Sequence, residues 1–132
     1  MSENTPCIHA GDSRLIFPCS GAADVGEIAD RTARLISREG NGKMCCLAAI
    51  VVGFEEALAT AQAAEKILAI DGCTGDCAKK ALELAGFTTF QHLRVTDLGL
   101  VKGHTPVTME RVRAAAMRGA GLLRAGAQAH AV

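Results

Sequence analysis

The sequence contains neither tryptophan nor tyrosine, and four phenylalanines bring its aromatic content to only 3%. Proteins that hold single-stranded nucleic acid rely on aromatic stacking platforms, which such a chain can scarcely build. An excess of charge is also lacking, because 14 Lys and Arg residues balance 14 Asp and Glu residues. A neutral chain offers no basic footprint for nucleic acid or for an anionic membrane. We therefore expect neither nucleic acid nor membrane as a partner.

Long hydrophobic segments are missing as well. The longest uncharged apolar run, residues 44–54, is too short to cross a bilayer. The chain begins Met-Ser-Glu-Asn-Thr-Pro, without the basic and then apolar stretch of a secretory signal. We therefore expect a soluble cytoplasmic protein, in a reducing compartment where structural disulfides rarely persist.

What the chain does have is a hydrophobic content of 49% over 132 residues, enough for one packed domain. Short apolar stretches alternate with helical patterns, which predicts an α/β fold with helices on both faces of a parallel sheet. We expect a single-domain three-layer α/β/α fold with a four-stranded, mainly parallel sheet. The domain should span 14–124, between a loose N-terminal extension at 1–13 and a frayed C-terminal tail at 125–132. Strands are expected at 14–19, 43–48, 67–70 and 90–95, and helices from 24 to the glycines at 40 and 42, at 54–66, at 76–85 and from 108 onward.

Helix boundaries give further expectations. Asp24 and Glu27 have the spacing of a capping box, in which Asp24 caps the first helix. Thr108 is a weaker cap for the last helix, which we expect to weaken at Gly119 and Gly121.

Six cysteines are the unusual feature of the composition. In a reducing compartment they serve as metal ligands, as catalytic thiols or as small buried hydrophobes. Ligands of a parallel α/β sheet bind at the carboxyl ends of its strands. The predicted strands deliver Cys19, the segment from Cys46, and Asp71-Gly72-Cys73 to that edge.

Cys73 and Cys77 form a C-x-x-x-C pair at a strand-to-helix junction. Their sulfurs can face the same way, and a helix N-terminus favours the thiolate form. Adjacent Cys45 and Cys46 would point to opposite faces of a strand, so at most one joins this site, and spacing leaves open which one. Cys7 lies two residues from His9 in the N-terminal extension, where such a pair is more often incidental.

The chain resembles the DGC-domain family, named for an Asp-Gly-Cys motif, to which zinc binding is attributed. The resemblance lies in residues 19–26, 43–48, 70–80 and 95–99, within a match that covers about Leu15 to Lys102. It implies a zinc site formed by Cys19, Cys46, Cys73 and Cys77, and this resemblance selects Cys46 over Cys45. One departure is the stretch Ala48–Val52, where family members are glycine-rich.

We therefore expect a small metal-binding protein, with zinc held by four thiolates in a sensor, carrier or structural role. Copper(I) and iron–sulfur clusters accept the same soft ligands. The alternative is a cysteine-dependent thiol oxidoreductase or a sulfur- or metalloid-handling enzyme. In that alternative Cys19 or Cys73 is the nucleophile and Cys77 the resolving thiol, so the residues leave open whether the protein is an enzyme. A homodimer or another protein partner also stays open.

Three further residues follow the predicted strands. We expect Asp71 to hold its loop by accepting backbone N–H groups. Asp97 should lie at the cleft edge, as a turn cap or as a ligand contact. His104 is the histidine that we expect closest to the cysteines, although a histidine in a loop is more often solvated.

Overall fold

A computed structural model describes residues 13–125 and contains one four-stranded sheet in which every strand is parallel. The strand order is β2-β1-β3-β4. This confirms the predicted α/β fold. The strands are β1 (Arg14–Pro18), β2 (Lys43–Met44), β3 (Lys66–Asp71) and β4 (Gln91–Arg94).

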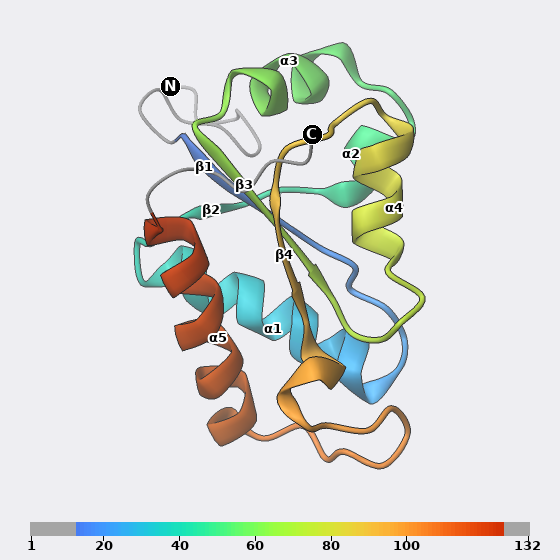
Figure 1. Ribbon diagram of the computed structural model, residues 1–132, viewed down its shortest axis with the longest axis vertical. Coiled ribbons are helices and arrows are strands. Elements are labelled where there is room, and N and C mark those ends of the chain that lie inside the picture. Colours follow the sequence, from blue (N-terminus) through green and yellow to red (C-terminus); the bar gives the residue numbers. More distant parts are fainter. Residues whose placement is uncertain (1–12, 126–132) are drawn as a thin grey trace.

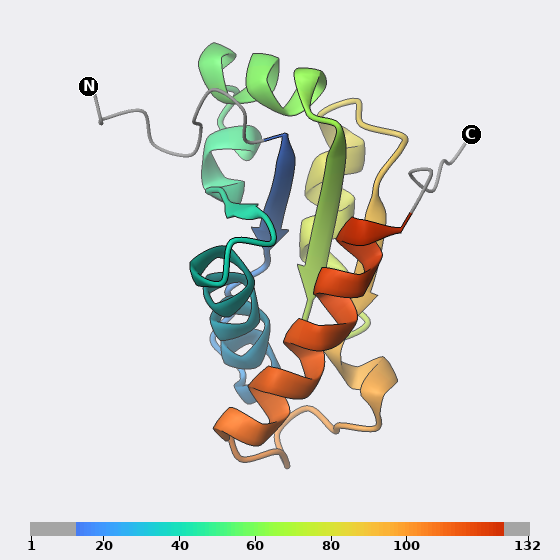
Figure 2. The ribbon, with the colours of Figure 1, turned by 90° about the vertical axis from the view of Figure 1, so that its left-hand side faces the viewer.

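Helices cover both faces of the sheet, so the predicted three layers are present. One layer contains the long helices that follow β1 and β4, which lie side by side (Figures 1 and 2). The other layer contains the three helices between β2 and β4. The helices are α1 (Asp24–Arg38), α2 (Leu47–Val51), α3 (Glu55–Ala63), α4 (Cys77–Leu84) and α5 (Met109–Arg124), and a short 3-10 helix, η1 (Val95–Leu98), follows β4.

The two central strands, β1 and β3, are buried on both faces. Ile16 lies opposite Leu68, and both pack into the core beneath α1 and α5. Their neighbours Leu15 and Ile67 also pair, and they pack into the core beneath α2, α3 and α4. This alternation of side chains follows the two-residue period of a strand. The sheet thus separates two apolar cores, and its ends remain for polar groups.

The strand expected at 43–48 is wrong, because only Lys43 and Met44 form β2. Cys45 makes the last ladder contact, its N–H donating to the carbonyl of Ile16 at 2.8 Å. Cys46 is then the N-cap of the short helix α2, and its carbonyl accepts the N–H of Ala49. The Leu-Ala-Ala sequence that follows favours helix over strand.

Two predictions about helices are also wrong. Ala23 is the N-cap of α1, so Asp24 and Glu27 form no capping box. α5 continues through Gly119 to Arg124, whereas we expected it to weaken. A Cβ on Gly119 would lie 2.8 Å from Ile36 Cδ1, so this glycine lets α5 pack closely on α1. The cap at Thr108 is confirmed, since its side chain accepts the N–H of Arg111.

Neither terminal segment can be compared with its prediction over its full length. The extension expected at 1–13 includes Cys7 and His9, which lie outside the described residues, as does the tail after Ala125. Within residues 13–125, no helix combines the length and apolar character that a membrane span requires.

Candidate metal centre

The strand order reverses between β1 and β3, which makes the carboxyl edge of these two strands a switch point of the sheet. From β1 the chain crosses to β2 on one side, and from β2 it returns to β3 on the other side. The loops after β1 and β3 therefore lead into α1 and α4, which cover opposite faces. Such a switch in strand order is where open α/β sheets bind their ligands.

Cys19 lies at this switch point, directly after β1. Its backbone N–H donates to the carbonyl of Ile70 at 2.9 Å, which extends the pairing of β1 with β3 by one residue. Burial raises the pKa of the Cys19 thiol, while the backbone N–H groups of Gly21 and Gly72 donate to its sulfur and act in the opposite sense. The negative charge of Asp71 adds to the increase in the pKa of Cys19. These surroundings favour the thiol form of Cys19 over the thiolate, compared with a free cysteine.

Cys73 and Cys77 enclose Gly75 from both ends of the loop after β3. A Cβ built on Gly75 would lie 3.6 Å from Cys73 Sγ and 3.9 Å from Cys77 Sγ. Cys73 is half-buried, whereas Cys77, the first residue of α4, is exposed. Both sulfurs therefore lie within 4 Å of one point beside Gly75.

The loops after β1 and β3 touch each other through glycines. A Cβ on Gly72 would lie 2.7 Å from the carbonyl carbon of Val25, and one on Gly26 would lie 2.7 Å from the carbonyl carbon of Gly21. No real Cβ atom tolerates such distances to backbone. The absence of a side chain at Gly72 therefore lets the loop that carries Cys73 contact the first turn of α1. The absence of a side chain at Gly26 lets α1 contact Gly21, two residues after Cys19.

Asp71 holds the start of α4, which agrees with its predicted role in the loop. Its carboxylate accepts the backbone N–H of Ala78 at 2.6 Å and that of Lys79 at 3.0 Å. Although Asp71 ends a strand, it thus satisfies two N–H groups that a helix N-terminus leaves open. His92 Nε2 lies 2.9 Å from Asp71 Oδ2, and Asp71 itself is 1% exposed.

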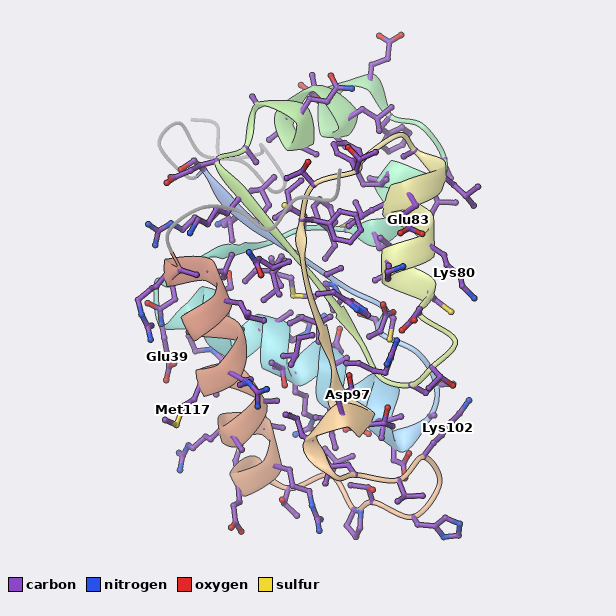
Figure 3. All side chains as sticks on the ribbon, viewed as in Figure 1. Glu39, Lys80, Glu83, Asp97, Lys102 and Met117 are labelled. Atoms are coloured by element: carbon purple, nitrogen blue, oxygen red, sulfur yellow. The ribbon has the colours of Figure 1, made fainter. Side chains whose placement is uncertain are left out.

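A second carboxylate network adjoins the first. Arg94 donates from Nε to Asp76 Oδ1 at 2.9 Å and from one terminal nitrogen to Asp76 Oδ2 at 2.6 Å. The other terminal nitrogen lies 3.3 Å from Asp97 Oδ1. Asp97, predicted at the cleft edge, belongs to η1, which follows β4 (Figure 3). It forms an ion pair with Arg94, the last residue of β4.

Asp71, Asp76 and His92 offer ligand atoms that all lie within 4.8 Å of one another. Their oxygens, however, already accept backbone N–H groups or the guanidinium of Arg94. A cation placed there would also meet the positive charge of Arg94. We interpret this group as the support of α4 rather than as a metal site.

The two adjacent cysteines after β2 differ in their environment. Cys45 is 5% exposed and belongs to the core beneath α2, α3 and α4. Cys46 is exposed at the start of α2, at the same edge of the sheet as Cys19 and Cys73. Of the two adjacent cysteines, Cys46 is therefore the one that solvent reaches.

Asp24 holds the loop after η1 instead of capping α1. Its carboxylate accepts the N–H of Gly103 and that of Thr105, each at 2.9 Å. These N–H groups, that of Gly103 foremost, lower the pKa of Asp24. His104 lies between them and is exposed, as expected of a histidine in a loop.

Comparison with known proteins places these features in a family. Residues 15–118 match the DGC domain. The chain belongs to the DGC domain family. It is also 30% identical over 88 residues to the anaerobic and virulence modulator AnvM of Pseudomonas aeruginosa, a match that covers 67% of each protein. No solved structure matches the chain.

The match to the DGC domain includes all four cysteines of the predicted site and also the polar network around α4. Sequence analysis missed His92 and Arg94 in that network. The signal was the spacing of these two basic residues, which are two apart in the strand that pairs with β3. Arg94 lies opposite Asp71 in the register. Residues two apart in a strand lie on the same face, and here that face adjoins the acidic end of β3.

Proposed function

We propose that this DGC domain binds a metal ion, zinc in the first instance, through Cys19, Cys46, Cys73 and Cys77, in a reducing compartment. Four thiolates are a typical donor set for a structural or storage-like zinc site, since they leave no position open for a substrate. We therefore infer a sensing, carrying or stabilising role and no turnover. The relative in Pseudomonas aeruginosa is named as a modulator, which favours regulation over catalysis.

The observation that carries the proposal is the arrival of cysteines from three adjacent parallel strands at one edge of the sheet. Cys46 follows β2, Cys19 follows β1 and Cys73 follows β3, in the order in which these strands lie. Cys77 joins them across Gly75. Soft sulfur donors in this number select zinc, copper(I) or an iron–sulfur cluster over hard cations.

The donor set and its surroundings fit such an ion. Repulsion from Asp71 and Cys77 contributes to the raised pKa of Cys19, and a cation would relieve that repulsion. The N–H groups of Gly21 and Gly72 already donate to the Cys19 sulfur, as outer donors do at thiolate-rich centres. The cysteine sulfurs would have to move closer together to bind one ion. Among residues 13–125, the group of ligand atoms that lie within 4.8 Å of one another consists of Asp71, Asp76 and His92, and it includes no sulfur.

Metal analysis of anaerobically purified protein tests the proposal. We expect about one zinc per chain, with four thiols that become reactive only after chelation. Serine at Cys19, Cys73 or Cys77 should abolish stoichiometric zinc. The matched control is Cys45→Ala, the neighbouring buried cysteine, which should retain zinc because it belongs to the core.

A metal-free protein would contradict the proposal and favour thiol chemistry. The exposed position of Cys77 at the first residue of α4, close to Cys73, supports that alternative. It predicts one thiol that alkylates rapidly and a Cys73–Cys77 disulfide after mild oxidation. Thiol counting and peptide mass mapping on the same preparation would distinguish the two functions.

A further inference from the structure

Two residues beside the predicted ligands have unusual backbone conformations. Ser20, with φ of 53°, directly follows Cys19, and Asp76, with φ of 52°, directly precedes Cys77. In the described part of the chain these are the non-glycine residues with positive φ. Left-handed backbone disfavours a residue with a Cβ by on the order of tenfold in population, so contacts elsewhere must hold it.

Asp76 is held by Arg94. The guanidinium contacts both carboxylate oxygens, at 2.9 and 2.6 Å, and the side chains of Arg94 and Asp76 are only 25% and 12% exposed. A two-point contact between planar groups fixes direction as well as distance. Since Arg94 belongs to β4, the pair connects Asp76, the N-cap of α4, to the sheet.

We propose that Arg94 is a positioning residue of the cysteine site, which holds the left-handed conformation of Asp76 and thereby directs Cys77 toward Cys73. The proposal rests on the proposed function, because Cys77 is one of the four inferred ligands. Asp71 completes the support by accepting the N–H groups of Ala78 and Lys79 in the next turn. Arg94 acts through Asp76.

Cobalt(II) titration of Arg94→Gln tests this role, because Co²⁺ reports tetrahedral thiolate binding by its absorption. We expect affinity to fall by about 10–100-fold, as when outer partners of a metal ligand are removed. The matched control is Arg31→Gln, which removes the same charge from an exposed ion pair with Glu27 on α1. It should leave affinity unchanged.

Rescue separates positioning from general stability. Glycine adopts left-handed backbone without a partner, so Asp76→Gly in the Arg94→Gln background should restore most of the lost affinity. Asp76→Ala in that background should not restore it, although both replacements remove the same carboxylate. Equal behaviour of the glycine and alanine variants, or unchanged affinity of Arg94→Gln, would overturn the proposal.

Amide hydrogen exchange keeps this inference separate from the proposed function. If the unmodified protein binds no Co²⁺, the proposed metal site fails, and exchange at Ala78 and Lys79 decides the role of Arg94. Faster exchange in Arg94→Gln that is reversed by Asp76→Gly supports positioning of the α4 start. Exchange that stays as in the unmodified protein overturns it.

Discussion

Single residues without side chains determine how closely the two cysteine-bearing loops approach. Gly72 contacts the first turn of α1 through backbone alone, and its N–H also donates to the sulfur of Cys19. Any side chain there would displace either the loop after β3 or the start of α1. Steric exclusion of a side chain therefore explains the glycine in the middle of the Asp-Gly-Cys sequence.

We predict that Gly72→Ala destabilises the fold by about 1–3 kcal/mol, the usual cost of forcing an added methyl into a packed site. Chemical denaturation measures this change. Gly121→Ala on α5 is the control, since no atom lies within 4 Å of the added Cβ. That control should gain up to about 1 kcal/mol from helix propensity. A Gly72→Ala protein as stable as the unmodified one would contradict the close contact.

At the scale of elements, the sequence patterns predicted the parallel strands and the long helices because apolar periodicity records burial. They failed where a few residues serve two elements. Cys45 makes the last ladder hydrogen bond of β2, and Cys46, the next residue, is the N-cap of α2. Two adjacent cysteines carry no pattern that would mark this boundary.

The contacts of the polar network were predictable only in part. Asp71 follows a strand and was expected to accept N–H groups, but the identity of its partners depends on how α4 docks. Asp24 has the spacing of a capping residue, yet its partners Gly103 and Thr105 are far away in sequence. Long-range partners are set by topology, which local spacing does not encode.

The loop held by Asp24 should respond to acid. The N–H groups of Gly103 and Thr105 place the pKa of Asp24 below its ordinary value of 3.8. The stabilisation is therefore fully present above pH 3.8 and is lost as pH falls through the lower value in the folded state. We expect the amides of Gly103 and Thr105 to lose protection from hydrogen exchange as pH falls below 3.8 and through the lower pKa of the folded state.

Asp24→Asn is the matched variant, because it keeps the shape of the side chain but cannot ionise in this range. Its protection at Gly103 and Thr105 should be weaker at neutral pH and should not change further in acid, once intrinsic exchange rates are removed. Protection in the unmodified protein that does not change in acid, or protection in Asp24→Asn that falls with pH as it does in the unmodified protein, would refute the role of Asp24.

On the scale of the whole molecule, the four predicted ligands lie outside the fully buried cores, although Cys19 packs against both cores and Cys73 packs against one. The two cores lie on either face of the sheet, beneath α1 and α5 and beneath α2, α3 and α4. The four predicted ligands lie at one edge, on loops and helix starts. A fold with two cores does not depend on an ion in the way that a zinc finger does.

We therefore predict that metal removal lowers stability without unfolding the protein. An ion present at 100 times its dissociation constant contributes about 2.7 kcal/mol, which corresponds to a change in Tm on the order of 10 °C for a domain of this size. Chelation should lower Tm by that amount while far-UV circular dichroism at room temperature stays the same. Cys73→Ser should show a Tm that responds neither to zinc nor to chelator. Loss of helical signal on chelation would mean that the ion, and not the two cores, maintains the fold.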